Sequence, residues 1–370
     1  MSADLLYSDV EQSLRESVRK LLASRLTPDD AMAGYDGEVD HSALWGALAG
    51  DLGLAALLIP EKFGGAGASA REAAVVLEEL GRSVAPVPFL SSAVIATVAV
   101  VTAADLEAVD DELAAELATG AKTAALAVPL SATGANLELS VSRDGDTLSG
   151  RVTSVADAAT ADVLIVPVLV ADGGMELWAV DRAAVTIAPV VSLDMTRPLA
   201  DVTFDGAHGV KLAAGDFAAK ATAKALQTGA GLLASEQLGL AQWCLETTLA
   251  YVKQRHQFGR AIGSYQAIKH RLADLWLEVG SAASAARYAA DCLATGSEDT
   301  AVAVSLAQAY CSDVAVHAAE EAIQLHGGIG MTWEHPAHLY LKRAKADQIA
   351  LGTPDQHRSR LAELVDLRAS

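Results

Sequence analysis

The chain has 370 residues, of which 52% are hydrophobic and only 5% aromatic, and its formal net charge at pH 7 is -20. A chain of this length can bury a large apolar core, and we expect two or three domains. The apolar residues are mostly Ala, Leu and Val, which favours helices packed on helices. The acidic balance argues against nucleic acid or an anionic membrane as a partner, because both require clustered cations. It still allows one anionic cofactor held by a few local arginines.

The N-terminus and the cysteines indicate the compartment. The first residues, "MSADLLYSDVEQ", contain no basic start followed by an apolar block, so we expect no signal peptide. The longest nearly apolar run begins at Ala93 and covers about 12 residues, too few to cross a bilayer. Cys244, Cys292 and Cys311 lie in apolar helical runs without a CxxC pattern, which is typical of reduced, buried thiols. These features predict a cytoplasmic protein without a metal site.

Residues 1–121 have the periodicity of helices. "SDVEQSLRESVRKLLASRL" places its Val and Leu residues on one face, and Ser8 with Glu11 forms the pattern of a capping box. "LWGALAGDLGLAALLIP" predicts a helix that ends near Pro60. "AREAAVVLEELGRSV" predicts a further helix, which the prolines of "APVPFLSS" stop. This part of the chain is predicted to be an N-terminal helical domain.

The pattern changes in residues 122–213. Runs such as "NLELSVSRDGDTLSGRV", "DVLIVPVLV" and "MELWAVD" are short, and several alternate apolar with polar residues. Gly, Asp and Asn separate them, as expected for antiparallel strands, and the Asp-Gly of "RDGD" favours a hairpin turn. This block is predicted to be a small middle β domain.

The helical period returns in residues 214–370. Three long helices are predicted over residues 217–256, 264–294 and 299–326, joined by short loops. Long antiparallel helices with short connections indicate an up-and-down four-helix bundle. The fold class is therefore mostly α with a small β domain.

Two motifs in this last part carry residues suited to a phosphate-bearing ligand. "RHQFG" supplies Arg255, whose planar fork of donors matches phosphate oxygens, and Phe258, which could stack on a flat ring. Gln257 and Gln266 could hydrogen-bond the polar edges of such a ring. Basic residues at a helix C-terminus also complement the helix macrodipole, so this motif alone leaves the structural explanation open.

The second motif is "QLHGGIGMTWEHP". Its glycines break a long helix and would let the backbone approach a ligand closely. A plain helix terminator has the same pattern. His326 and His335 are spaced unlike the ligands of a metal site, and capping or surface hydrogen bonding explains them.

In this order and on this helical frame, the two motifs resemble those of the acyl-CoA dehydrogenase family. The likeness extends over nearly the whole chain, because "LGLAALLIPEKFGGAG" is similar to the family's N-terminal domain and "SLDMTRPLADVTFD" to its β domain. The resemblance implies an N-terminal helical domain, a β barrel and a C-terminal four-helix bundle. It also implies FAD, a dimer of dimers, and α,β-dehydrogenation of an acyl-CoA thioester. A carboxylate would remove the α proton, and electrons would leave through an electron-transferring flavoprotein.

The resemblance assigns one half of a flavin site to this chain. In the family, two subunits build each site, and the equivalents of the two motifs reach the neighbouring subunit's flavin at its pyrophosphate and adenosine side. We call this the trans half. The residues that match it are Arg255, Gln257, Phe258, Gln266, Gln324 and Gly328.

The half that would hold a flavin ring in the chain's own pocket departs from the family pattern. Where members carry a "TEPxAGSD"-like stretch, this chain has "AVPLSATGANLE", which keeps only the hydroxyls of Ser131 and Thr133. The family's "WITN"-like flavin contact aligns with "SVAD", residues 154–157, so its aromatic residue and threonine are both missing.

The catalytic base is also missing from its usual positions. Leu351 occupies the position of the family's glutamate, with Gly352 and Thr353 keeping the rest of the turn. Some relatives carry the glutamate on the long helix before "RxxFG", and there this chain has Gly229. Glu236, two turns further on, and Asp355 are the remaining carboxylate candidates, although Glu236 has a simpler explanation as an ordinary helical carboxylate.

Several functions remain open at this point. The chain could be one subunit of a heterotetramer with two copies of each chain, in which a paralogue supplies the base. Bacterial members of this kind exist in the family, and some act on steroid side-chain thioesters. It could instead be a homotetrameric enzyme with a relocated base, a non-catalytic scaffold, or a flavin-free bundle such as a carrier or chaperone. We favour the heteromer, because the residues retained reach outward and those lost face the chain's own pocket.

Overall fold

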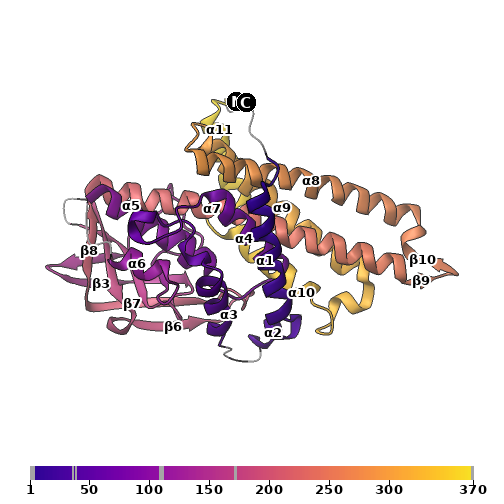
Figure 1. The fold of residues 1–370 in the computed structure, drawn as a ribbon, viewed down its shortest axis with the longest axis horizontal. Coiled ribbons are helices and arrows are strands. Elements are labelled where there is room, and N and C mark those ends of the chain that lie inside the picture. The colour runs from indigo at the N-terminus through magenta and orange to yellow at the C-terminus, as the bar shows by residue number, and fades with distance from the viewer. Residues whose placement is uncertain (1–4, 36, 38–39, 108–111, 171–172, 368–370) are drawn as a thin grey trace.

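The computed structural model describes residues 5–35, 37, 40–107, 112–170 and 173–367. It contains the three predicted parts in the predicted order: N-terminal helices, a β sheet and a long helical bundle (Figure 1). The sheet lies at one end of the molecule, and the paired helices α7 and α8 extend to the other. The mostly α fold class with a small β domain is therefore confirmed.

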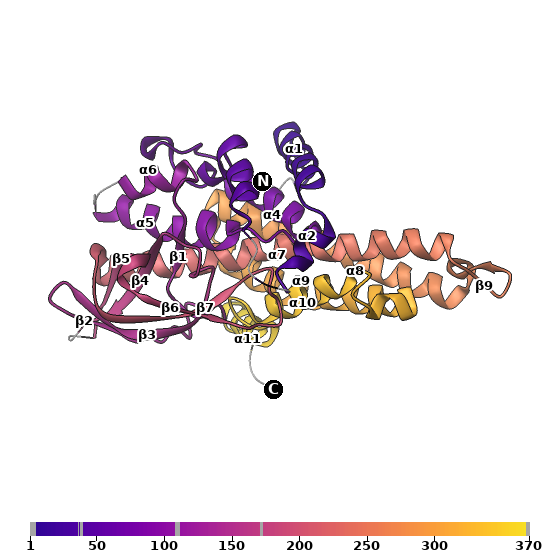
Figure 2. The ribbon, with the colours of Figure 1, turned by 90° about the horizontal axis from the view of Figure 1, so that it is seen from below.

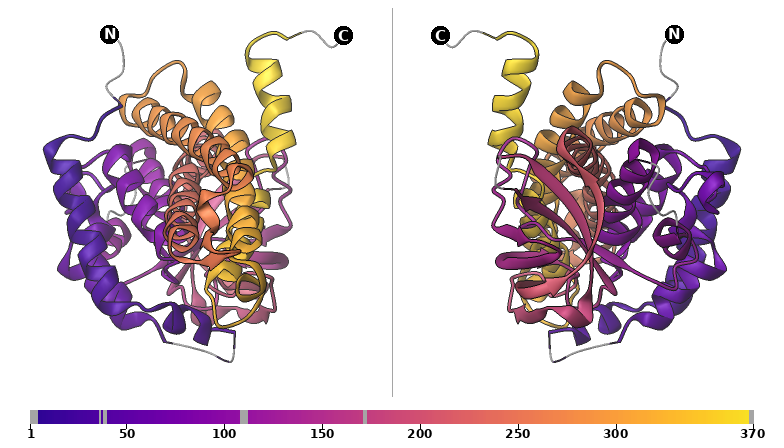
Figure 3. Two further views of the ribbon diagram at one scale, coloured as in Figure 1. Left: turned by 90° about the vertical axis from the view of Figure 1, so that its right-hand side faces the viewer. Right: turned by 90° about the vertical axis from the view of Figure 1, so that its left-hand side faces the viewer.

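The N-terminal part is built from short helices packed beside the bundle, as the end-on views of Figure 3 show. Its elements are α1 (Asp9–Arg25), α2 (Pro28–Ala33), α3 (Ser42–Gly46), a π turn (Ala47–Asp51), two 3-10 turns (Leu54–Ala56 and Glu61–Phe63), α4 (Ala70–Arg82), a π-helical segment (Phe89–Ala96), α5 (Thr97–Glu107) and α6 (Glu112–Ala118). The capping box at Ser8 and Glu11 is present.

The single helix predicted to end near Pro60 is wrong. The chain leaves the helix after Asp51, and Gly53 adopts a φ of 68°, which is left-handed backbone that glycine enters without strain.

The apolar run from Ala93 is longer in the structure than the sequence indicated. By length and composition, one described helical stretch, Phe89–Leu106, is apolar enough to cross a membrane, and 83% of it is buried inside the protein. It packs as a core helix.

Eight strands form the sheet of the middle part. They are β1 (Ala124–Leu126), β2 (Val141–Asp144), β3 (Thr147–Ala156), β4 (Val163–Leu169), β5 (Met175–Asp181), β6 (Thr186–Val190), β7 (Leu199–His208) and β8 (Val210–Ala214). The hydrogen-bonded order is β6-β7-β3-β2-β4-β5-β8, with β1 added to β4. The implied barrel is thus an open curved sheet in the described residues, with β6 and β8 at its edges. The predicted hairpin joins β2 to β3, with Asp144 opposite Thr147.

The bundle begins with a helix that runs the length of the molecule. Its elements are α7 (Gly215–Gln254), the short strands β9 (His256–Gln257) and β10 (Arg260–Ala261), a 3-10 turn (Ile262–Ser264), α8 (Gln266–Thr295), α9 (Thr300–His326), a 3-10 turn (Gly327–Met331), α10 (Ala337–Ile349) and α11 (Pro354–Leu364). The three long helices begin and end within a few residues of the predicted positions. The three cysteines are buried and form no disulfide, as predicted.

The helix α7 also joins the bundle to the N-terminal part. A Cβ at Gly81 of α4 would lie 2.1 Å from the carbonyl oxygen of Glu236, and a Cβ at Gly239 would lie 1.9 Å from that of Glu78. The two helices can approach this closely only because glycine stands at both crossing points. Figure 2 shows α7 running beneath the N-terminal helices from the sheet toward β9.

Candidate active-site cavity and cofactor-contact surface

The "RHQFG" motif forms the tip of the α7–α8 hairpin (Figure 1). Gln257 and Arg260 pair across it, and Phe258 and Gly259 between them have φ values of 53° and 78°. A two-residue hairpin turn of this kind needs positive φ at both central positions. For phenylalanine that conformation costs roughly 1–2 kcal/mol, and its ring is 91% exposed. The turn therefore holds an aromatic ring out in solvent at an energetic cost.

Backbone and ring contacts fix the tip around Arg255. The Arg255 N–H donates to the Tyr251 carbonyl at 2.9 Å, and its own carbonyl accepts from Ile262 at 2.8 Å. The guanidinium of Arg260 lies 3.8 Å above the Tyr265 ring. Arg255 itself is exposed, as are Gln257 and Gln266, and it forms no ion pair within the part of the chain that the structure describes. The backbone is held while these donors remain free for a ligand.

The second motif lies at the same end of the bundle. Helix α9 ends at His326, and Gly327 follows with a φ of 64° and a ψ of -139°, a combination available only to glycine. The His326 ring stacks on Tyr251 with centroids 4.4 Å apart, which joins the end of α9 to the last turn of α7. Gln324 and Gly328 are exposed. We call the six exposed positions Arg255, Gln257, Phe258, Gln266, Gln324 and Gly328 the cofactor-contact surface.

A small apolar cavity marks the position expected for a catalytic base. Its volume is about 20 Å³, and its lining residues come from the π-helical segment, the sheet, α7 and the loop after α10: Ser91, Ile95, Leu126, Val128, Pro129, Leu130, Ala156, Leu226 and Leu351. A cavity of this volume holds about one water molecule, for which roughly 10–15 Å³ is enough. The cavity therefore has no space for a flavin ring or an acyl chain.

Leu351 closes this cavity. It is 3% exposed, and its N–H donates to the Leu130 carbonyl at 2.7 Å, while its carbonyl lies 2.9 Å from Nε2 of His357. These bonds draw the loop after α10 against the loop that replaces the family's flavin-binding stretch. Of the two hydroxyls that this stretch keeps, the one on Thr133 donates to Oδ1 of Asn136 at 2.8 Å.

The two positions where the family carries its base face each other. A Cβ at Gly229 would lie 2.7 Å from Ile95 and 3.1 Å from Cδ1 of Leu351. Only glycine fits there, because the leucine and isoleucine side chains already fill the space. Sequence reasoning treated these positions as separate alternatives, but the structure makes them neighbours across one closed cavity.

The two candidates for a relocated base lie elsewhere. Both Glu236 oxygens accept from Nη2 of Arg197 at 2.7 Å, and Oε1 also accepts from Nη1 of Arg343 at 2.5 Å. Burial alone would raise the pKa of Glu236, but the two guanidinium groups outweigh it and hold the pKa below its usual range. A carboxylate paired in this way is a poor proton acceptor. The Asp355 side chain is 93% exposed and pairs with Arg358 at 3.0 Å. Neither residue lines the cavity.

One carboxyl group beside the cavity was not among the sequence candidates. The Ser91 hydroxyl, which lines the cavity, donates to Asp157 at 2.5 Å. Burial raises the pKa of Asp157 above its usual range, because no guanidinium contacts it directly. The sequence showed an acid at the end of "SVAD" but no sign of a partner 66 residues earlier. This buried carboxyl, bonded to Ser91, is a structural group.

Similar proteins identify the family. Residues 8–121 match the acyl-CoA dehydrogenase N-terminal domain, and residues 219–365 match its C-terminal domain. The chain is 36% identical to the acyl-CoA dehydrogenase IpdE2 of Mycolicibacterium smegmatis over 355 residues, which cover 96% of this chain and 98% of that protein. The chain belongs to the acyl-CoA dehydrogenase family.

Solved structures of acyl-CoA dehydrogenases share this fold. A variant of the Tcur3481–Tcur3483 steroid ACAD has a TM-score of 0.83 and 27% identity, covering 97% of this chain and 98% of that one. The ChsE4–ChsE5 complex from Mycobacterium tuberculosis has a TM-score of 0.86 over the full length of both chains, at 24% identity, which shows the fold alone.

The acyl-CoA dehydrogenases are oxidoreductases that bind FAD, and the two parts of this chain fit that cofactor differently. The cavity at Leu351 does not fit a flavin ring, because it is too small and Ser91 is the one polar residue among those that line it. The cofactor-contact surface does fit a dinucleotide, because it offers an arginine with no ion pair among the described residues, an exposed aromatic ring and three amides.

Proposed function

We propose that this chain is one subunit of a heteromeric, FAD-dependent acyl-CoA dehydrogenase, with two copies each of this chain and a paralogue. The chain supplies the trans half of the flavin site, and the paralogue supplies the ring-binding β domain and the carboxylate base. The reaction is α,β-dehydrogenation of an acyl-CoA thioester in the cytoplasm, with electrons passing to an electron-transferring flavoprotein. The observation that carries the proposal is the cavity of about 20 Å³ lined by Leu351, whose side chain packs beside Gly229.

The distance between the two halves supports a second subunit. Gly229 and Arg255 are both placed by α7, and a helix rises 1.5 Å per residue, so they lie about 39 Å apart along its axis. An extended dinucleotide does not span that distance. The cofactor-contact surface of one chain must therefore serve a flavin seated in another chain.

The residues of this chain would bind and orient the shared cofactor. Arg255 would donate its N–H groups to pyrophosphate oxygens, and Phe258 would stack on a flat ring beside them. The amide of Gln324 would hydrogen-bond the adenosine side, where Gly328 lets the backbone approach. When bound, FAD accepts the hydride from the β carbon of the acyl group.

The substrate proposed is a bulky acyl-CoA, such as a steroid side-chain thioester. Support comes from the solved Tcur3481–Tcur3483 structure, which is named as a steroid ACAD and shares 27% of its sequence with this chain. That structure and the ChsE4–ChsE5 complex are each named for two different proteins, which fits a heteromeric assembly.

The test is to purify the chain alone and after co-expression with a glutamate-bearing paralogue, and to measure bound flavin by absorbance. We expect colourless protein alone and a yellow complex with one flavin for each pair of unlike chains. The complex should bleach when acyl-CoA is added without oxygen. A yellow assembly of this chain alone that bleaches with acyl-CoA would refute the heteromer in favour of a relocated base. A complex whose flavin content is unchanged by Arg255→Ala would favour the scaffold.

A further inference from the structure

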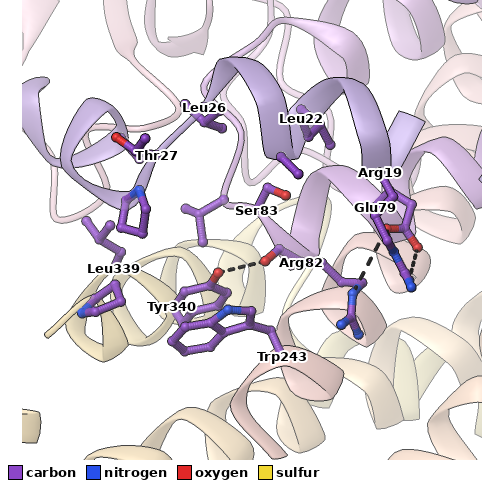
Figure 4. Close-up of a pocket in the computed structure, with 15 residues that line it drawn as sticks. Arg19, Leu22, Leu26, Thr27, Glu79, Arg82, Ser83, Trp243, Leu339 and Tyr340 are labelled. Carbon is purple, nitrogen blue, oxygen red and sulfur yellow. Dashed lines mark hydrogen bonds and ion pairs between the residues drawn. The ribbon is translucent and has the colours of Figure 1, made fainter. Parts of the chain in front are cut away.

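A larger cavity, of about 250 Å³, opens where α1 and α2 meet the ends of α4 and α10 and the middle of α7 (Figure 4). It shares no lining residue with the cavity at Leu351. It also contains none of the six positions of the cofactor-contact surface. Its volume approaches the lower limit of small-molecule sites, roughly 300 Å³. The proposed function leaves this cavity unexplained.

One wall of the cavity is a fixed aromatic surface. The rings of Trp243 and Tyr340 stack with centroids 3.6 Å apart and planes 5° apart. The Tyr340 hydroxyl donates to the Arg82 carbonyl at 2.6 Å, which holds the pair in place against the end of α4 (Figure 4). A flat, rigid wall of this kind suits a ring-shaped apolar group.

The facing walls are aliphatic, and one of them is strained. Leu22 and Leu26 of α1 and Leu339 of α10 contribute alkyl side chains. Val84, just past the end of α4, lines the cavity with a φ of 45°. Glycine is the usual residue at such a helix end, and a β-branched residue with positive φ is a clear outlier. Strain of this kind persists where the surroundings enforce it, and here it places an isopropyl group in the cavity wall.

The polar edge of the cavity offers one exchangeable cation. Arg19 is committed, because its guanidinium makes bonds of 2.7 and 2.6 Å to the buried Glu79. The side chain of Arg82 is only 15% exposed, and it bonds to Gln242 at 3.2 Å and to both oxygens of Glu246 at 3.1 and 2.5 Å. Glu246 is 61% exposed, so this partner is open to solvent and a carboxylate enclosed in the cavity can compete with it for Arg82.

We propose that this cavity binds a small cyclic monocarboxylic acid. The ring packs between the Trp243–Tyr340 pair and the alkyl side chains, and the carboxylate accepts the paired N–H groups of Arg82 in place of Glu246. The site shares no residue with the cofactor-contact surface or the cavity at Leu351, so it can be tested whether or not the heteromer exists.

The test uses isothermal titration of the full-length chain with cyclohexanecarboxylate. Ala23 lines the cavity from an exposed position on α1, so Ala23→Phe fills the cavity without disturbing a buried side chain. The matched control is Ala273→Phe, at an exposed position on α8 away from the cavity. Ala23→Phe removes the space for the ring, and Arg82→Gln removes a charge-assisted hydrogen bond. Each should weaken binding by about 10-fold or more. Ala273→Phe should bind like the wild type.

Four results would overturn the proposal. The first is that the wild type does not bind the acid at about 10 mM, a concentration at which binding of even a weak ligand is detected. The second is equal affinity in Ala23→Phe and Ala273→Phe. The third is equal affinity for the acid and its uncharged amide, which would remove the role of Arg82. Loss of binding when the paralogue is present would show that a protein surface covers the cavity instead, and would also overturn it.

Discussion

Leu351 shows how one side chain fills the space between two segments. Its φ of 55° is left-handed backbone that costs a leucine roughly 1–2 kcal/mol. Burying the side chain contributes about 1.5–3 kcal/mol, which offsets the strain. Because Gly229 faces it, the leucine can fill the space that a base and substrate would need. The residue closes a pocket and does no chemistry.

This role predicts the outcome of Leu351→Glu. The new carboxylate would be enclosed among apolar side chains with no guanidinium to pair with, so we expect a loss of about 3–5 kcal/mol in the free energy of unfolding at pH 8. Denaturant unfolding followed by circular dichroism measures it. The heteromer's dehydrogenase activity should stay unchanged per folded complex.

The control is Leu351→Met, which conserves volume and polarity and should cost less than about 1.5 kcal/mol. A Leu351→Glu protein that is as stable as Leu351→Met, or that gains activity without a partner, would show that the cavity can open to admit substrate.

At the scale of elements, the helices and the tip of the α7–α8 hairpin have different roles. Its helices are long and regular, and they carry the tip away from the rest of the chain (Figure 1). The tip has its own fixed turn, in which Arg260 packs on Tyr265 while Arg255 remains unpaired among the described residues. Two arginines of one short motif thus have different roles.

This difference predicts that Arg255→Ala lowers flavin content while leaving the fold intact. One charge-assisted phosphate contact contributes about 1.5–3 kcal/mol, so the heteromer should bind FAD about 10- to 100-fold more weakly. Titration of the flavin-free complex with FAD, followed by flavin fluorescence, gives the dissociation constant. Lys253→Ala is the matched control, because it removes an exposed cation from the last turn of α7. If FAD binding were weakened equally in Arg255→Ala and Lys253→Ala, the effect would come from loss of any nearby positive charge and not from a phosphate contact of Arg255.

The sequence predicted elements better than contacts. The three long bundle helices follow from uninterrupted 3.6-residue periodicity, and their ends coincide with glycine-rich or basic turns. The helix predicted before Pro60 failed because Gly53 adopts positive φ, and periodicity cannot show that. The two motifs were found from residue type and order. The closure at Leu351, the pairing of Asp157 with Ser91 and the burial of Glu236 depend on residues distant in sequence, which a local pattern does not report.

At the scale of the whole molecule, buried charges join the sheet to the bundle. Arg197, before β7, bonds to Asp347 of α10 and Glu236 of α7, and Arg343 of α10 bonds to Glu236 and Asp194. Three carboxyl groups therefore surround two guanidinium groups. Burial raises the pKa of Asp347 to about 7, because it outweighs the lowering effect of Arg197. Oδ2 of Asp347 has no hydrogen-bond partner within the described residues. With Asp347 protonated, the charges balance.

The raised pKa predicts a pH-dependent effect of Asp347→Asn. In the folded chain Asp347 keeps its proton up to about pH 7, whereas in the unfolded chain it loses the proton near pH 4. Its contribution to stability therefore falls as pH rises through this window, by on the order of 1 kcal/mol per pH unit, and levels off above pH 7. Asparagine mimics the protonated form, so the variant should gain stability relative to wild type as pH rises from 5 to 8. Urea unfolding at both pH values measures this gain.

Comparison with the wild type at each pH isolates Asp347 from other groups. Burial lowers the pKa of His335 to about 4 and lowers that of His326, so these histidines make the fold less stable in acid in both proteins. Glu236→Gln is a second control. It removes one carboxylate from two buried guanidinium groups, and it should lower the free energy of unfolding by about 3–5 kcal/mol throughout pH 5 to 8. A stability difference between wild type and Asp347→Asn that does not change with pH would contradict the assignment of the proton.

The glycine crossing of α4 and α7 has a consequence for synthesis of the chain. Gly81 leaves the ribosome roughly 160 residues before Gly239, a delay of about 10–30 s at bacterial elongation rates. During this time the apolar face of α4 has no α7 to cover it. The nascent N-terminal segment must therefore keep leucine and valine side chains of α4 uncovered by α7 until the second half of the chain has been made.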